Sequence, residues 1–275
     1  MYRIILFILS LLFYSNSYSA TPPIVSAFLP VKNEINTLPA CLKSIKGLFD
    51  KIVIVYVDEP DDGSVEYIKK WCTEDHKCIH KAYPYPVYPF YDQNYKDQYD
   101  FQNYLTPYYN FGLNFFESEE WVLKIDADQI YIRPHLREFV QKIKETGTDE
   151  DLFTATGYNT LKHHNQLTHL KERKLIRTNG NVFASKKKNL LEYKQTDLYE
   201  TPKINYKNKK HYPNPLSFRF MKPLKTFKIE KFDQQSDPEK QMDNLSNKEI
   251  QIFEKYIRPL FDNDSVYKNI KVTPN

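Results

Sequence analysis

Glycine, cysteine and methionine are scarce in this chain: six, three and three occur among 275 residues. No glycine-rich loop with a basic residue stands near Pro30, which excludes phosphate-binding loops of that construction. The cysteines, at Cys41, Cys72 and Cys78, match no spacing used by zinc sites. The spacing therefore disfavours zinc binding by sulfur.

A large excess of charge of one sign is also absent. The formal net charge is +4, too small to indicate nucleic acid as a partner. Hydrophobic residues make up 41% of the chain and charged residues 27%, which is typical of folded globular proteins. A chain of 275 residues suits one large domain, or a domain with an appendage.

Long apolar segments are missing too, with one short exception at the start. Residues 4–13 are apolar apart from Ser10, follow Arg3 and precede the small, mostly polar residues 15–20. This run is shorter than the ~20 residues of a membrane-spanning helix and has the layout of a secretory signal peptide. We therefore expect residues 1–20 to be a signal peptide or an N-terminal anchor. The protein is then exported or membrane-associated, on the cytosolic face if the segment stays uncleaved.

Export would affect the cysteines. Cys72 and Cys78 are close enough in sequence to close a small disulfide loop, which would leave Cys41 as a buried thiol. The alternative is that all three are reduced and inert.

The first part of the chain alternates between strand and helix patterns. Residues 24–30 form an apolar strand that we expect Pro30 to end, and residues 51–57 form a nearly continuous β-branched strand. A helix capped by Asn36 or Thr37 follows the first strand, and a helix capped by Ser64 follows the second. This alternation with short links predicts a mainly parallel sheet flanked by helices.

Residues 121–132 form an apolar run that ends in an Asp-x-Asp triplet, Asp126 and Asp128. In extended backbone, side chains two residues apart point to the same side, so both carboxylates can face one site. Oxygen ligands of this kind suit Mg2+ or Mn2+. The alternative for an isolated triplet is a solvated strand end.

Other strand ends support the metal interpretation. Glu34 follows the first strand and Asp58 follows the second. Ligands of parallel sheets bind beyond the carboxyl ends of the strands, so the topology predicts that Glu34, Asp58 and the Asp126–Asp128 pair converge.

Patterns further along are less regular. Helices are expected within residues 97–117, after Pro134 and within 247–261, and strands at 151–158 and as a pair within 171–184. From residue 185 the chain is rich in Lys, Tyr and Asn with poor periodicity.

Four motifs together resemble family 2 glycosyltransferases of the GT-A fold. They are Pro30-Val31-Lys32-Asn33-Glu34, the strand 51–57 with Asp58 and Asp62-Gly63-Ser64, the segment 110–114, and residues 121–128. Their order and spacing match over residues 24–145, about half of the chain. The resemblance implies an α/β, Rossmann-type sheet, a nucleotide-sugar donor, a divalent metal and transfer to an acceptor hydroxyl, usually with inversion.

The resemblance also implies roles for single residues. Asp58 would bind the base of the nucleotide and Glu34 would lie near the nucleoside. Asp126 would lie near the ribose and the metal, with Asp128 the firmer metal ligand. Asn110 would be a structural or donor-pocket residue. One departure is that Asp58 and Asp61 offer two registers for the base contact, of which we favour Asp58.

An inverting transferase needs a general base for the acceptor hydroxyl. The family's usual Glu-Asp pair is not plainly present, and Asp197 and Glu200 are the candidates, against a solvated acidic turn. We expect residues 21–184 to be the GT-A-like core and residues 185–275 an irregular extension on the acceptor side.

The expected function is therefore a glycosyltransferase acting on a glycan or lipid-linked acceptor in surface glycan or lipopolysaccharide assembly. Alternatives are a nucleotidyltransferase of similar fold, which the missing glycine-rich loop disfavours, and an exported, non-catalytic carbohydrate-binding protein. Nucleotide sugars are made in the cytosol, so a signal peptide requires an anchor facing the cytosol, a lumenal compartment supplied with donor, or a secreted effector.

Overall fold

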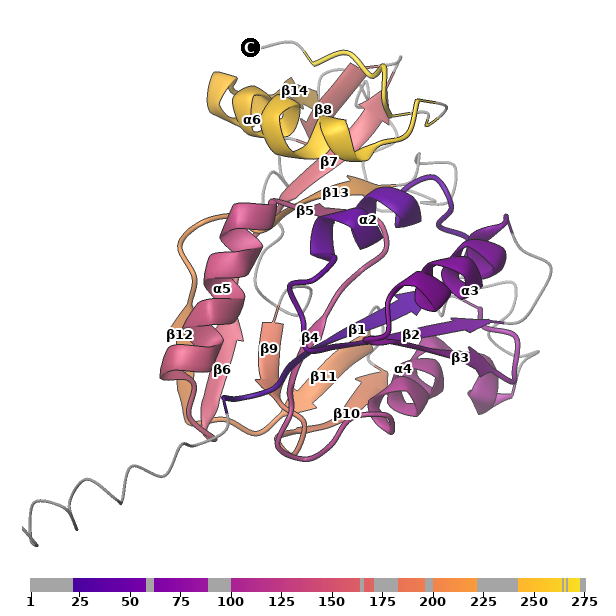
Figure 1. Ribbon diagram of the computed structural model, residues 1–275, viewed down its shortest axis with the longest axis vertical. Helices are drawn as coiled ribbons and strands as arrows, with labels where there is room; N and C mark the ends of the chain where they lie inside the picture. The colour runs from indigo at the N-terminus through magenta and orange to yellow at the C-terminus, as the bar shows by residue number, and fades with distance from the viewer. Residues whose placement is uncertain are drawn as a thin grey trace, which may run out of the picture.

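The computed structural model describes residues 22–57, 62–88, 100–163, 166–170, 183–195, 200–221, 242–263, 265 and 267–272. The expected signal segment, Asp58, Asp61 and Asp197 lie outside these residues. A mixed α/β architecture is built on a seven-stranded sheet of order β12-β6-β9-β4-β1-β2-β3 (Figure 1). The expected mainly parallel sheet flanked by helices is confirmed.

The parallel part of this sheet comes from the first half of the chain. It contains β1 (Val25–Val31), β2 (Lys51–Val57), β3 (Cys78–Tyr83) and β4 (Trp121–Lys124). β1 lies in the middle and pairs in parallel with β2 and β4. The near-continuous apolar sequences of β1, β2 and β4 fit strands that are covered on both faces.

Pro30 does not end the first strand, as the sequence predicted, because β1 continues to Val31. The last residue of β1 that pairs with β4 is Phe28, whose carbonyl also accepts the N–H of Ile125 at 2.8 Å. Pro30 lies two residues further along β1, so its backbone nitrogen faces the same edge as that of Phe28, but past the end of β4. A residue without an N–H is tolerated there because no strand remains to accept its hydrogen bond.

Helices cover the two faces of the sheet unequally (Figure 1). Three helices pack on one face: α2 (Leu38–Ile45), α3 (Ser64–Glu74) and α5 (Arg133–Thr146). The other face holds α4 (Leu105–Leu113), preceded by the 3-10 turn η1 (Phe101–Asn103), and the hairpin of β10 (Leu190–Gln195) with β11 (Glu200–Ile204). Alternate residues of β1 therefore enter different cores, Ala27 and Leu29 on the first face and Phe28 on the second.

The start of α3 differs from the prediction that Ser64 caps it. Gly63, at φ 96°, is the N-cap, a left-handed conformation that glycine adopts readily. The hydroxyl of Ser64 donates to Asp62 Oδ1 at 2.6 Å and accepts the backbone N–H of Glu34 at 3.0 Å. Ser64 thus ties the turn after β1 to the start of α3.

Three strands extend the sheet beyond β4, and the first of them, β9, reverses the strand direction. β9 (Phe183–Lys186) is antiparallel to β4 and to β6 (Asp151–Thr154), and β12 (Asn208–His211) is parallel to β6. The sheet therefore draws on residues from both sides of residue 184.

A second, five-stranded sheet has the order β14-β8-β7-β13-β5. Its strands are β5 (Gln129–Tyr131), β7 (Tyr158–His163), β8 (Gln166–Leu170), β13 (Ser217–Met221) and β14 (Met242–Asn244). The C-terminal turns α6 (Asn247–Ile252), π-helical η5 (Phe253–Ile257) and 3-10 η6 (Arg258–Leu260) follow. The expected helix over 247–261 is thus confirmed in place, although its geometry changes twice.

Strands after residue 185 were missed because each is short. The pairing of β10 with β11 also shifts register between Leu190 and Glu192, which interrupts the alternation of apolar and polar residues that reveals a strand.

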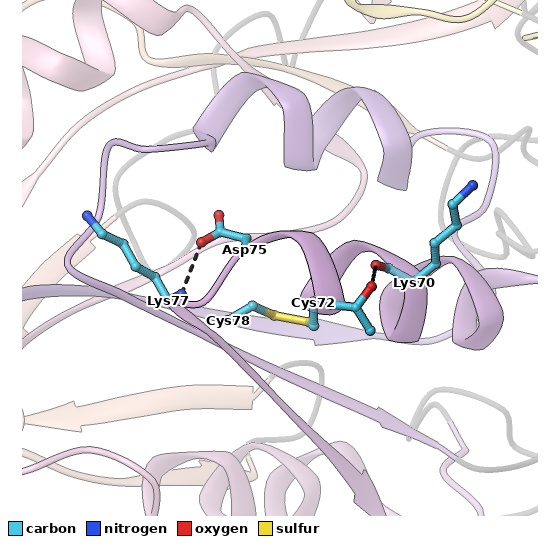
Figure 2. The surroundings of a disulfide bond; sticks show 6 residues. Lys70, Cys72, Asp75, Lys77 and Cys78 are labelled. Carbon is cyan, nitrogen blue, oxygen red and sulfur yellow. Dashed lines mark hydrogen bonds between the residues drawn. A yellow bond between two sulfur atoms is a disulfide. The ribbon is translucent and has the colours of Figure 1, made fainter.

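A disulfide joins Cys72, in the last turn of α3, to Cys78 at the start of β3 (Figure 2). The turn between them is held by the backbone N–H of Lys77, which donates to Asp75 Oδ1 at 3.0 Å. Cys41 is a buried free thiol. Of the two alternatives that the sequence left open, the structure shows the disulfide with Cys41 free. None of the helices among the described residues combines the length and apolarity required to cross a membrane.

Candidate functional site

Asp126 follows the end of β4 and is held on both oxygens. Its Oδ1 forms an ion pair with the Lys124 ammonium, and its Oδ2 accepts Gln129 Nε2 at 3.0 Å. Lys124 and Asp126 are two residues apart in nearly extended backbone, so both side chains point to the α4 face. There the Lys124 ammonium also lies over the ring of Tyr109, 5.1 Å from its centroid.

Burial and the ion pair shift the pKa values of Lys124 and Asp126 in opposite ways. Burial alone would lower the pKa of Lys124, but the Asp126 carboxylate outweighs it and the pKa lies above its ordinary value. Burial would likewise raise the pKa of Asp126, but Lys124 and Arg219 outweigh it and the pKa is lowered. Both groups therefore stay charged at neutral pH.

Asp128 is held from the second sheet. Arg219, on β13, donates from Nε to Asp128 Oδ2 at 2.9 Å, and the backbone N–H of Phe220 donates to the Asp128 carbonyl at 2.8 Å. The nearby Asp128 carboxylate raises the pKa of Arg219. The other carboxylate oxygen, Oδ1, is buried and has no hydrogen-bond partner among the described residues. Asp128 thus has one oxygen anchored and one unused.

Glu34 follows the end of β1, three residues after Val31. The buried Cys41 thiol has its pKa raised by burial and by the charges of Asp128, Asp126 and Glu34. Burial and the charges of Glu34 and Asp128 together raise the pKa of Tyr267 to about 12. Cys41 and Tyr267 are therefore each within electrostatic range of Glu34 and Asp128. Convergence of Glu34 with the two aspartates on one ligand stays a prediction.

Both polar atoms of the Asn110 amide form hydrogen bonds within the protein. Its Oδ1 accepts the backbone N–H of Tyr193 at 2.6 Å, and its Nδ2 donates to the Tyr193 carbonyl at 3.1 Å. This reciprocal pair docks β10 onto α4. Contact of Asn110 with a donor stays a prediction.

A small pocket opens beside the carboxyl ends of β1 and β2. It is lined by Val31, Lys32, Asn33, Tyr56, Val57, Ser64 and Val65. Asn33 has φ 54°, a left-handed conformation that Asn tolerates better than most residues and that is enriched at functional sites. Asp58, expected to bind a base, is the next residue after Val57 in sequence and lies outside the described residues.

The described residues fit a divalent cation only if a substrate or water supplies most of its ligands. No group of three or more His, Cys, Asp or Glu able to hold a metal occurs within the described ranges. Mg2+ is commonly bound by only one or two carboxylates, with substrate phosphates and water completing its coordination. A buried carboxylate oxygen without a partner, Asp128 Oδ1, is a ligand of that kind.

Three residues of the candidate site were not predicted from the sequence, and the two candidate bases stay open. Lys124 could have been found, because it precedes Asp126 by two residues on the same strand face. Arg219 and Tyr193 carry no such signal, since they reach the site from distant strands. Neither candidate base can be placed: Asp197 lies outside the described residues, and only the backbone of Glu200, the first residue of β11, is described.

Comparisons with known proteins follow this geometry. TarS residues 1–349 from S. aureus align with a TM-score of 0.49 and 10% identity, covering 72% of this chain and 60% of that chain. A structure described as a glucose-1-phosphate thymidylyltransferase from Bacillus anthracis, in complex with a sucrose, aligns with a TM-score of 0.36 and 10% identity, covering 60% of this chain and 72% of that one. No curated protein matches the sequence.

The family comparison is the decisive one. The family model for CgtA, described as beta-1,4-N-acetylgalactosaminyltransferase, matches residues 14–214, well over half of the chain. That range includes Glu34, Asn110, Asp126 and Asp128. The chain therefore belongs to the CgtA family of glycosyltransferases, and its resemblance to family 2 glycosyltransferases is confirmed.

Proposed function

We propose that this glycosyltransferase binds a nucleotide-sugar donor through Mn2+ or Mg2+ at Asp128, and transfers the sugar to an acceptor hydroxyl. One observation carries the proposal: Asp128 Oδ1 is buried without a partner among the described residues, while Arg219 anchors Oδ2. This oxygen follows the carboxyl end of the central strand β4, and ligands of parallel sheets bind at such strand ends.

The protein groups have distinct tasks in this proposal. Arg219 fixes the orientation of Asp128, and Lys124 with Gln129 fixes Asp126 towards the ribose and the metal. The nucleoside lies at the carboxyl ends of β1 and β2, with Glu34 and Asp58 near it. When bound, the cation supplies Lewis-acid stabilisation of the diphosphate as it leaves.

Inversion and the general base also belong to the proposal. An attack on the face opposite the diphosphate inverts the anomeric centre, and the acceptor hydroxyl must lose a proton to a carboxylate. Asp197 and Glu200 remain the proposed bases. Both stand in the second half of the chain: Glu200 is the first residue of β11, and Asp197 lies in sequence between β10 and β11.

The family name suggests the sugar. It specifies a beta-1,4-N-acetylgalactosaminyltransferase, and we extend N-acetylgalactosamine to this chain as the transferred group. Its usual activated form is the uridine diphosphate ester. The acceptor is a glycan or lipid-linked hydroxyl in surface glycan or lipopolysaccharide assembly.

A donor screen tests the activity. Purified protein with Mn2+ is given UDP-, GDP- and CDP-activated sugars, with and without glycan acceptors, and the released nucleoside diphosphate is measured. The expected result is release from UDP-N-acetylgalactosamine, faster with a suitable acceptor. Nucleotide binding with no turnover of any donor and acceptor pair would instead support a non-catalytic carbohydrate-binding protein.

We propose an exported or membrane-associated location through residues 1–20, because a Cys72–Cys78 disulfide persists in oxidising compartments. Alkylation of thiols in intact source cells before lysis is the measurement. When the chain is unfolded in the presence of the alkylating reagent, Cys41 is expected to be the one cysteine that reacts, because Cys72 and Cys78 are held in the disulfide. Three alkylated cysteines would contradict the oxidising location and favour the cytosolic face.

A further inference from the structure

Tyr193 on β10 brings a phenol group into the donor site from the second half of the chain. Its backbone is fixed by the reciprocal pair with the Asn110 amide, which imitates a neighbouring strand. Its ring packs edge-on against Tyr109, with centroids 5.0 Å apart at 65°. Two contacts with α4, the Asn110 amide and the Tyr109 ring, therefore set where the hydroxyl lies.

That hydroxyl lies among the charged groups of the site. The ring of Tyr109 that contacts Tyr193 also carries the Lys124 ammonium over it. Tyr193 in turn is within electrostatic range of Lys124 and Asp126. The phenol group is thus on the same side of the sheet as the Lys124–Asp126 pair.

The hydroxyl is also unsatisfied. Tyr193 is 2% exposed, and its OH has no hydrogen-bond partner among the described residues. Buried hydroxyls normally find a partner, and those that lack one need an explanation. Three other buried side-chain atoms share this state: Trp121 Nε1, Asp128 Oδ1 and Asp151 Oδ1. Two of the four, on Tyr193 and Asp128, belong to residues that face the charged groups of the site.

We infer that the Tyr193 hydroxyl hydrogen-bonds the nucleoside diphosphate part of the donor, and that Asn110 is the positioning residue that holds Tyr193 there. The inference rests on the proposed function. A diphosphate supplies the acceptor oxygens that the Tyr193 hydroxyl lacks here. Its negative charge is opposite to that of the nearby Lys124 ammonium. Asn110 then acts on the donor through β10, without touching it.

Calorimetric titration with UDP, GDP and CDP in the presence of Mn2+ tests the role of Tyr193. The variant Tyr193→Phe keeps the ring on Tyr109 and removes only the hydroxyl. A hydrogen bond to a charged group implies binding about 10-fold to 100-fold weaker than wild type for the nucleotide that wild type prefers. The control is Tyr206→Phe, because Tyr206 is 43% exposed and lies between β11 and β12.

Asn110→Leu tests the positioning role. It removes both bonds to the Tyr193 backbone, and weaker binding of similar size is expected. The double variant Asn110→Leu with Tyr193→Phe should bind no more weakly than the weaker single variant, because both remove the same contact. Additive losses would mean that Asn110 acts separately from Tyr193, and would overturn the positioning role.

The outcomes separate this inference from the function on which it rests. If wild type binds none of the three nucleotides, the proposed donor class is wrong. If wild type binds one of them and Tyr193→Phe binds it equally well, the function stands and the inference about Tyr193 is overturned.

Discussion

At the scale of single residues, the site carries its own counterions. Asp126 is paired with Lys124 and Asp128 with Arg219, so two carboxylates meet two cations. Breaking such a pair by removing one partner is costly, because the other charge is left buried. The divalent cation that we propose at Asp128 would bind next to the Arg219 guanidinium, which repels it. Contacts of the cation with the diphosphate of the donor would have to offset that repulsion.

Arg219→Gln is expected to change stability and metal response in opposite directions. Without metal, Asp128 Oδ2 loses its partner, and the free energy of unfolding should fall by about 2 kcal/mol. With Mn2+, the rise in Tm should exceed that of wild type, because the repelling charge is gone. Thermal unfolding with and without Mn2+ measures both effects.

The matched control for this change is Arg137→Gln, the same substitution on the exposed surface of α5. It should alter neither Tm nor its response to Mn2+. An equal Mn2+ shift in Arg219→Gln and wild type would mean that Arg219 and the cation do not share Asp128.

The carboxylates of the candidate site could be predicted from the sequence, but the residues that contact them from later strands could not. Asp126, Asp128 and Glu34 were predictable because each follows an apolar strand, and parallel strands end at one edge. Arg219 and Tyr193 were not predictable, because their places depend on the pairing of β13 with β5 and on the docking of β10 against α4. Those contacts join segments more than 80 residues apart.

At the scale of elements, α4 is the part that links the parallel sheet to the hairpin. It carries Tyr109 and Asn110 on one side and packs Gly112 against β1 and β2 on the other. A Cβ at Gly112 would lie closer to the Phe28 ring than van der Waals contact allows, and 3.1 Å from Val55 Cγ2. The helix can therefore lie this close to the sheet only with glycine at that position.

Gly112→Ala is expected to push α4 away from the sheet. Overpacking of a filled core costs about 1–3 kcal/mol, so denaturant unfolding should show a loss of that size. Because Asn110 moves with the helix, affinity for the nucleotide should fall as well. Asn114→Ala, at the exposed C-cap of α4, is the control and should leave both unchanged. Wild-type stability in Gly112→Ala would contradict the close packing.

Elements with a strong period were predictable from sequence and those without one were not. The strand over 51–57 and the helix after Pro134 appear as β2 and α5 because their apolar residues repeat along a whole element. The helix expected over 97–117 is confirmed only as α4 and η1, since the aromatic residues around it fill the core from turns. β12 and β13 are too short, at four and five residues, for a pattern to emerge.

At the scale of the whole molecule, the site joins two sheets. Asp126 and Asp128 lie between β4 of the seven-stranded sheet and β5 of the five-stranded one, and Arg219 reaches them from β13. The family match ends at residue 214, before Arg219. The part of the chain that the family model matches therefore provides the carboxylates, and a segment beyond it provides the residue that orients one of them.

In the proposed function, Asp128 holds a divalent cation together with a nucleoside diphosphate. Calorimetric titration with UDP, with and without Mn2+, compares wild type and Asp128→Asn, a change that keeps the shape and removes the charge. Mn2+ is expected to tighten UDP binding at least about tenfold in wild type and to have no effect in the variant. An equal Mn2+-dependent gain in Asp128→Asn would contradict the proposed role of Asp128.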